Sequence, residues 1–282
     1  MSINNANCKN CKICNFELNE FIDHTAKCSN CGVLLYYPYP NSEEIDSAFM
    51  SEEQGYEWYA NSFERKIKGF SDVITFAINS VDQKEYHILD YGGASGQFAL
   101  IFKSFFPKSK IYITDINDNS LFKEYTSFNN QIKFNEFEDN EKKFDLIFLN
   151  DVYEHVEDPV KLLSILRGKL NSNGTIFVDT PRQFWIYPLF RLLNNYIYKK
   201  ILKGTVSRAH LQIWTNRSFQ ISLEKSNLKI VKKKYYSELT QDPAYYVKGM
   251  SINNKFLKNI ILFSTTIFLF TFKNKIFAVL KK

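Results

Sequence analysis

The sequence predicts an α/β fold with a mainly parallel sheet, preceded by a small cysteine-rich ribbon. Three observations support this prediction. Strand-like and helix-like segments alternate through residues 86–150, which implies right-handed crossovers between parallel strands. The run Ile88-Leu89-Asp90 is followed at once by a turn rich in Gly, Ala and Ser and then by a helical pattern. Two close cysteine pairs lie near the N-terminus.

All five cysteines lie within the first 31 residues. Two C-x-x-C pairs separated by 13 residues are typical of a structural zinc site with four thiolates. Because such knuckles turn with positive φ after their second cysteine, Asn15 after Cys14 and Gly32 after Cys31 suit the role. Cys8 is then left over, and the alternative is a set of reduced thiols. The predicted zinc ligands are Cys11, Cys14, Cys28 and Cys31.

The ribbon is expected to end at Pro38 and Pro40, which gives three parts: residues 1–40, 41–83 and 84–282. Its strands should come from Phe16 to Ile22 and from Val33 to Tyr37. A helix should start at Ser42, and the apolar positions of residues 56–80 predict a long amphipathic helix that links the ribbon to the core.

The linking part leads into the alternating elements. We predict strands at 86–90, 110–115, 131–137 and 144–149, with helices at 97–106 and 118–127. The second strand ends at Asp115, 19 residues after Gly96, where a carboxylate can accept both ribose hydroxyls of a nucleoside cofactor. Asp90 directly precedes the glycine turn and is unfavourable beside a pyrophosphate. An ammonium and a sulfonium suit that negative setting better, which indicates S-adenosylmethionine (SAM) rather than NAD.

At this point the sequence resembles a known family. The pattern Asp90-x-Gly92-x-Ala94-x-Gly96 resembles the first motif of class I SAM-dependent methyltransferases. The stretch from Lys143 to Pro159 is similar to the fourth-strand signature of the ubiquinone-type branch. Residues 173–181 and 210–215 continue that similarity, and the N-terminal cysteine pairs resemble the zinc-ribbon members of the branch.

The resemblance implies a Rossmann-like, seven-stranded mixed sheet. Strands at 175–179 and 228–237 would be the fifth and sixth, with a helix at 216–226 between them. The strand at 275–281 would be the seventh, antiparallel and placed between the fifth and the sixth. Asn173-Gly174 is expected to turn the chain into the fifth strand.

The resemblance also implies how SAM is bound. The glycine turn should approach the methionine part, Asp115 should hold the ribose, and Ile116 should pack near adenine. Asn150 and Asp151 should lie beside the amino-acid end of SAM. The implied cofactor-binding residues are Asp90, Gly92, Gly93, Ala94, Gly96, Asp115, Ile116, Asn150 and Asp151.

Methyl transfer needs a base only when the acceptor carries a proton that must leave. His155 and His210 are the catalytic residues we predict, because histidine has a pKa suited to that task near neutral pH. For His155 the alternative is a structural hydrogen bond near a helix start.

Two apolar segments stand apart from the motifs: an insert over 183–207 with its core at 184–203, and an insert over 240–273 with its core at 255–272. Both cores are aromatic and have basic flanks, which suits helices lying on a membrane surface. The alternative is helices packed on the core or at a dimer interface.

The composition limits the range of functions. The formal net charge of +6 comes from 36 Lys and Arg against 30 Asp and Glu, and it does not demand nucleic acid. The N-terminus has no apolar stretch of signal-peptide length, so we expect a cytoplasmic protein, with peripheral contact to the inner membrane face as a hypothesis.

We predict a SAM-dependent methyltransferase that acts on a small molecule, by O- or C-methylation of a sugar, glycan or lipid-linked intermediate. The alternative is a zinc-ribbon module that binds RNA or a protein partner and retains a vestigial SAM pocket.

Overall fold

The computed structural model describes most of the 282-residue chain, and all structural statements below concern the residues that it describes. These are residues 9–46, 67, 69–76, 85–94, 96–115, 132–134, 141–183, 206–238, 256, 259, 262–263, 267 and 273–282. The predicted helix at 118–127, the insert core 184–203 and nearly all of the core 255–272 lie outside them.

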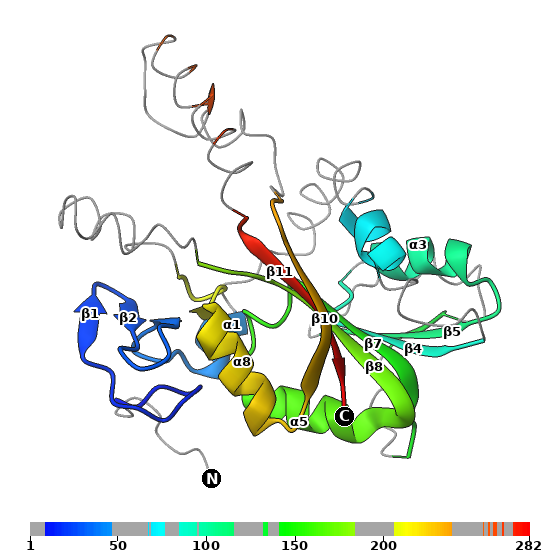
Figure 1. Ribbon diagram of the computed structural model, residues 1–282, viewed down its shortest axis with the longest axis horizontal. Coiled ribbons are helices and arrows are strands. Elements are labelled where there is room, and N and C mark those ends of the chain that lie inside the picture. The colour runs from blue at the N-terminus through cyan, green and yellow to red at the C-terminus, as the bar shows by residue number, and fades with distance from the viewer. Residues whose placement is uncertain are drawn as a thin grey trace.

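A seven-stranded mixed sheet forms the centre of the molecule (Figure 1). Its order is β10-β11-β8-β7-β4-β5-β6, and β11 runs antiparallel to both of its neighbours, whereas the pairs from β8 to β6 are parallel. The predicted Rossmann-like sheet, with its last strand inserted between the fifth and sixth, is confirmed. The strands are β4 (His87–Tyr91), β5 (Lys110–Thr114), β6 (Ile132–Phe134), β7 (Phe144–Asn150), β8 (Leu170–Pro181), β10 (Lys229–Tyr236) and β11 (Lys275–Lys281).

Helices cover both faces of the sheet because its central strands are apolar on both sides. On one face, α3 (Gln97–Phe105) and helical residues 69–76 bury Phe98 and Phe102 against Phe148 of β7. On the other face, α5 (Pro159–Lys169) and α8 (Asn216–Lys225) pack against alternate residues of the same strands. The carboxyl ends of the parallel strands are therefore left for the site.

The two helices on that second face begin with recognisable caps. The Asp158 carboxylate accepts a hydrogen bond from the Lys161 N–H at 2.9 Å, and Pro159 occupies the first turn of α5. Thr215 and Ser218 form a reciprocal capping box at the start of α8. These caps fix where α5 and α8 start, directly after the segments that carry the predicted catalytic residues.

The fifth strand differs from its predicted bounds. β8 begins at Leu170, and Asn173-Gly174 lies inside it rather than in a turn before it. The pairing partner shifts from Leu170 opposite Phe144 to Thr175 opposite Leu146, so the extra residues form a bulge in the strand. Gly174 suits this bulge because a Cβ there would lie 2.9 Å from the Phe144 carbonyl oxygen.

A second, smaller sheet contains the ribbon strands β1 (Glu20–Ile22), β2 (Thr25–Lys27) and β3 (Leu34–Tyr36). β1 and β3 lie within the predicted ranges, whereas β2 was not predicted, and α1 (Ser42–Asp46) follows them as expected. The fourth strand of this sheet is β9 (Gln212–Ile213), which comes from the methyltransferase-like part of the chain and was not predicted. The Gln183 side chain donates to the carbonyls of Gly32 and Ile213, joining the ribbon to the end of β8.

The ribbon and the sheet share one apolar core. Cys11, Ile13 and Leu18 belong to the same buried cluster as Trp214 and the helices α5 and α8. The Trp214 ring is fully buried and stacks on the Tyr153 ring with centroids 4.6 Å apart. In the described part of the chain, no helix is long and apolar enough to cross a membrane.

Candidate functional site

The glycine turn crosses the carboxyl end of β4 with three of its residues at positive φ. Gly92, Ala94 and Gly96 have φ values of 69°, 43° and 76°. The N–H groups of Gly92 and Gly93 both donate to the Thr114 carbonyl of β5, at 2.7 and 3.2 Å. A Cβ at Gly92 would lie 2.5 Å from the Val152 side chain, so the turn depends on glycine there for space as well as for φ.

Asp90 lies beneath this turn with its side chain fully enclosed. Among the described residues, one of its carboxylate oxygens is buried without a hydrogen-bond partner, and a Cβ at Gly93 would lie 2.6 Å from that oxygen. Burial, and secondarily the nearby Asp115 carboxylate, raises the pKa of Asp90 to about 7. A cation placed beside Asp90 would favour its ionised form.

Asp115 directly follows β5, and its carboxylate accepts a hydrogen bond from the Ala94 N–H at 2.9 Å. The structure therefore brings Asp115 to the glycine turn as predicted. Ile116 lies outside the described residues. Within the part of the chain that the structure describes, Gln97 and Asn150 add further buried polar atoms without partners: the side-chain oxygen of Gln97 and both amide atoms of Asn150.

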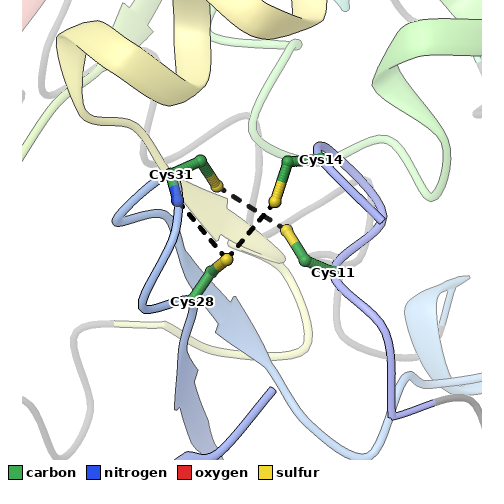
Figure 2. Close-up of side chains that lie close together, drawn as sticks. All are labelled: Cys11, Cys14, Cys28 and Cys31. Carbon is green, nitrogen blue, oxygen red and sulfur yellow. Dashed lines mark hydrogen bonds between the residues drawn. The ribbon is translucent and has the colours of Figure 1, made fainter. Parts of the chain in front are cut away.

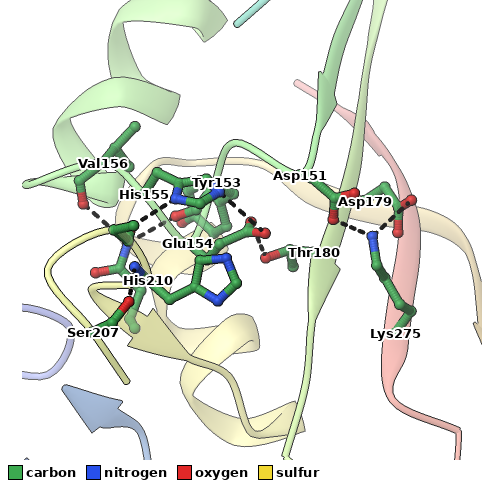
Figure 3. A network of polar contacts seen from close by, with 12 residues as sticks. Asp151, Tyr153, Glu154, His155, Val156, Asp179, Thr180, Ser207, His210 and Lys275 are labelled. Carbon is green, nitrogen blue, oxygen red and sulfur yellow. Dashed lines mark hydrogen bonds and ion pairs between the residues drawn. The ribbon is translucent and has the colours of Figure 1, made fainter. Parts of the chain in front are cut away.

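Asp151 follows β7 with a φ of 52°. Its carboxylate forms an ion pair with Lys275 of β11, and the same ammonium lies 3.5 Å from Asp179 (Figure 3). The ammonium also lies 3.2 Å from Glu238. Tyr236 donates a hydrogen bond to the Asp179 carboxylate. Burial raises the pKa of Asp179 to about 7, an effect that the neighbouring Lys275 opposes. None of Asp179, Glu238 and Lys275 was predicted, because they become neighbours only through the insertion of β11.

His155 and His210 lie together, with ring centroids 4.8 Å apart (Figure 3). The His155 Nδ1 lies 2.6 Å from the Ala209 carbonyl oxygen, which can only accept, so Nδ1 carries a proton. His155 Nε2 faces the buried Glu154 carboxylate at 3.7 Å, and that carboxylate accepts a hydrogen bond from Thr180. Desolvation, then the proximity of His155, lowers the pKa of His210 to about 4. The residue is nevertheless exposed at the surface.

The four predicted ribbon ligands converge in the ribbon (Figure 2), beside the segment in which Thr215 donates a hydrogen bond to the Cys31 carbonyl. The Cys11 and Cys31 sulfurs lie 3.7 Å apart and the Cys14 and Cys28 sulfurs 3.4 Å apart. Zn–S bonds of about 2.3 Å in a tetrahedron require sulfurs slightly under 4 Å apart, so this set fits zinc. Asn15 and Gly32 have φ values of 64° and 78°, as predicted for the residues after the second cysteines. Cys8 lies outside the described residues.

Comparison with known proteins places this geometry in a family. Residues 62–233, about 60% of the 282 residues, match the family described as a methyltransferase domain. The chain belongs to this methyltransferase family. The methyltransferase is 34% identical over 84 residues to the ubiquinone biosynthesis O-methyltransferase of Histophilus somni (strain 2336), which is 27% of this chain and 35% of the relative.

Another relative is the tRNA U34 carboxymethyltransferase of Campylobacter jejuni subsp. jejuni serotype O:23/36 (strain 81-176), 53% identical over 38 residues, or 14% of this chain and 13% of the relative. The matches thus span about a third or less of these relatives. A crystal structure of coclaurine N-methyltransferase bound to N-methylheliamine and SAH has a TM-score of 0.52 at 11% identity, covering 75% of this chain and 71% of that one. At that identity the likeness concerns the fold alone.

Proposed function

We propose that this methyltransferase transfers the methyl group of SAM to a hydroxyl or carbon of a small-molecule acceptor. The observation that carries the proposal is the set of buried, unpartnered polar atoms on Asp90, Gln97 and Asn150 around the glycine turn. Buried polar groups are nearly always satisfied, so these unsatisfied atoms around the turn support a polar ligand there. The relatives support the same class of reaction.

The residues present fit SAM. Asp115 would accept from the ribose hydroxyls, and Asp90 with Asn150 would face the charged methionine portion beside the turn of Gly92, Gly93, Ala94 and Gly96. Asp151 would contribute from the end of β7, while Ile116 stays a sequence-based prediction. When bound, SAM supplies an electrophilic methyl group, so the protein's tasks are to orient the acceptor, exclude water and remove a proton where one must leave.

His155 is the residue we assign to proton removal. Its Nδ1 proton is held by the Ala209 carbonyl, which leaves the Nε2 lone pair as the basic site. Glu154 lies 3.7 Å from that nitrogen and would stabilise the imidazolium after proton uptake. His210, whose pKa is lowered to about 4, stays neutral near pH 7 and can accept a hydrogen bond from the acceptor.

Zinc bound by Cys11, Cys14, Cys28 and Cys31 is the second part of the proposal. Four protein ligands leave no open position, so this zinc would hold the ribbon together rather than take part in chemistry. Because β9 pairs with β3 and directly follows the His210 loop, an ordered ribbon would also position that loop. Metal analysis of the purified chain would test this, with about one zinc per chain expected.

The acceptor class we favour is a sugar, glycan or lipid-linked intermediate. The apolar inserts follow β8 and β10, near the carboxyl edge of the sheet, and their cores at 184–203 and 255–272 stay our hypothesis for contact with a membrane surface. RNA is the second candidate, since the tRNA U34 carboxymethyltransferase of Campylobacter jejuni matches a short stretch of 38 residues. Flotation with anionic liposomes tests the membrane contact, and absence of binding at low salt would contradict it.

Calorimetry with SAM and with its demethylated product tests the cofactor. We expect micromolar binding that is lost in Asp115→Ala and kept in Gly168→Ala, whose new Cβ meets nothing within 4 Å. Transfer of tritiated methyl groups from SAM into cell extract, separated into organic, aqueous small-molecule and RNA fractions, then identifies the acceptor class. Label in RNA alone would overturn the small-molecule proposal, and absence of SAM binding would overturn the enzyme.

A further inference from the structure

The Lys275 ammonium lies at the carboxyl edge of the sheet, where the chain leaves for both apolar inserts. Asp179 lies near the end of β8, shortly before the insert that begins at 183. Glu238 follows β10 at the start of the second insert, and Lys275 begins β11 directly after that insert. Asp151 closes the group from the end of β7. This cluster therefore lies at the carboxyl ends of β7 and β8 and at the start of β11, beside the residues expected to bind the cofactor at the end of β7.

Lys275 is saturated by its neighbours. An ammonium has three N–H donors, and three carboxylates surround this one, those of Asp151, Asp179 and Glu238. The Lys275 side chain is only 6% exposed, and despite burial, which acts in the opposite direction, these carboxylates hold its pKa well above the usual range. It therefore has no donor left for an anionic ligand.

Asp179, in contrast to Lys275, keeps one unused hydrogen-bonding atom. Its side chain is 7% exposed, and one oxygen is engaged by both Lys275 and Tyr236. The other oxygen is buried and has no hydrogen-bond partner among the described residues. A carboxylate oxygen can only accept unless it is protonated, so this atom calls for a donor from outside the cluster.

The net charge of the cluster around Lys275 also favours a ligand that donates hydrogen bonds. Three carboxylates around one ammonium leave an excess of negative charge, and the Tyr236 hydroxyl adds none while its proton is held by Asp179. A carboxylate or phosphate brought here would be repelled and would meet no free donor. A neutral hydroxyl or an ammonium would satisfy the open oxygen of Asp179.

We propose that Asp179, held in place by Lys275 and Tyr236, is an acceptor-binding residue that selects a hydroxyl- or ammonium-bearing group over a carboxylate or phosphate. The proposal rests on the proposed methyltransferase function and specifies the chemistry of its acceptor. The position of the cluster at the base of both apolar inserts fits an acceptor with a polar head and an apolar remainder.

The test uses three probes with the same apolar chain: n-octyl β-D-glucoside, n-octylamine and n-octanoate, each below its micelle concentration. Binding to the full-length chain saturated with demethylated SAM is measured by calorimetry. We expect the glucoside or the amine to bind at least about tenfold more tightly than octanoate, because only they bring a donor. Whether the glucoside or the amine binds more tightly distinguishes a hydroxyl from an ammonium acceptor.

Asp179→Asn is the decisive variant, because it keeps the shape and changes one acceptor oxygen into a donor. It should weaken the preferred probe about tenfold and leave binding of demethylated SAM unchanged. Asp145→Asn is the matched control. This carboxylate lies near the start of β7, at the other end of the strand from Asp151, where it accepts hydrogen bonds from His87 and Asn171. The control should leave probe binding intact even though it removes buried hydrogen bonds.

Equal or tighter binding of octanoate would overturn the proposal, as would glucoside and amine binding that does not depend on Asp179. Failure to bind demethylated SAM would instead count against the methyltransferase function itself, so the two failures are distinguishable. If Asp179→Asn is destabilised in thermal unfolding, Tyr236→Phe provides a second measurement, since it removes the partner that orients Asp179 without changing the charge.

Discussion

Replacing Asp90 by Asn should change how the stability of the ligand-free protein depends on pH. Burial and the neighbouring Asp115 raise the pKa of Asp90 from 3.8 to about 7. As the pH rises above 4, the carboxyl ionises in the unfolded chain but stays protonated in the folded one. The unfolded state therefore binds fewer protons, and stability falls with rising pH until about 7, above which the loss is constant.

The magnitude follows from the same values. At about 1.4 kcal/mol for each pKa unit, the wild-type protein should lose ~3 kcal/mol between pH 5 and pH 8 through this one group. Asp90→Asn cannot ionise and lacks this loss. The variant should therefore gain ~3 kcal/mol relative to wild type across that interval, whatever the other groups do, because their contribution is common to both proteins.

Urea unfolding of both proteins at pH 5, 6, 7 and 8 measures the effect. Asp145→Asn serves as the control for replacing a hydrogen-bonded carboxylate, because Asp145 accepts two hydrogen bonds near the start of β7, at the strand end remote from the glycine turn. Parallel stability curves for wild type and Asp90→Asn would refute the reasoning, since they would mean that Asp90 is ionised in the folded protein at pH 5. Bound SAM should reduce the difference, because its positive charges favour the ionised carboxylate.

Three further predictions concern the turn, the buried lysine and the ribbon. Gly92→Ala should abolish SAM binding and lower the free energy of unfolding by about 1–3 kcal/mol, because the new Cβ would lie 2.5 Å from Val152 at a φ of 69°. Chemical unfolding measures the stability and calorimetry measures the binding. Unchanged binding would count against a tight turn. Lys275→Met should lower the free energy of unfolding by about 3–5 kcal/mol at pH 8, because it leaves buried carboxylates unpaired. The loss should be smaller at pH 5, where Asp179 is protonated. Chemical unfolding at both pH values measures the difference. Cys28→Ser should lower the zinc content from about one ion per chain to near zero in metal analysis, and retention of the ion would mean that Cys28 is not a ligand.

The alternation of apolar runs, turns and helical patterns predicted a mainly parallel sheet. The place of the last strand, antiparallel and between the fifth and sixth, was predicted from the resemblance to SAM-dependent methyltransferases. The sequence also placed Asp90, Asp115 and the glycine turn together, since these residues are neighbours at the ends of adjacent strands. Local signals were enough for the parallel sheet and for this group of residues. The predictions of individual cofactor-binding and catalytic residues still await the binding and transfer experiments.

The Asp179 and Lys275 pair could not be found in this way. Lys275 looks like an ordinary basic residue at the start of a strand, and only the antiparallel insertion of β11 brings it between Asp151 and Asp179. The bulge at Gly174 was missed because the local signal was misleading. An Asn-Gly pair is typical of a turn, and only the pairing with β7 keeps it in the strand.

The pairing of β3 with β9 has a consequence for how the protein is made. Leu34 lies opposite Ile213, so the last strand of the ribbon sheet leaves the ribosome some 180 residues after the first three. An emerging ribbon has its outer edge open throughout that interval, while the strands of the large sheet up to β8 are synthesised. Its four cysteines are nevertheless complete after residue 31 and can bind metal early. We therefore expect the nascent ribbon to depend on zinc far more than the finished protein does.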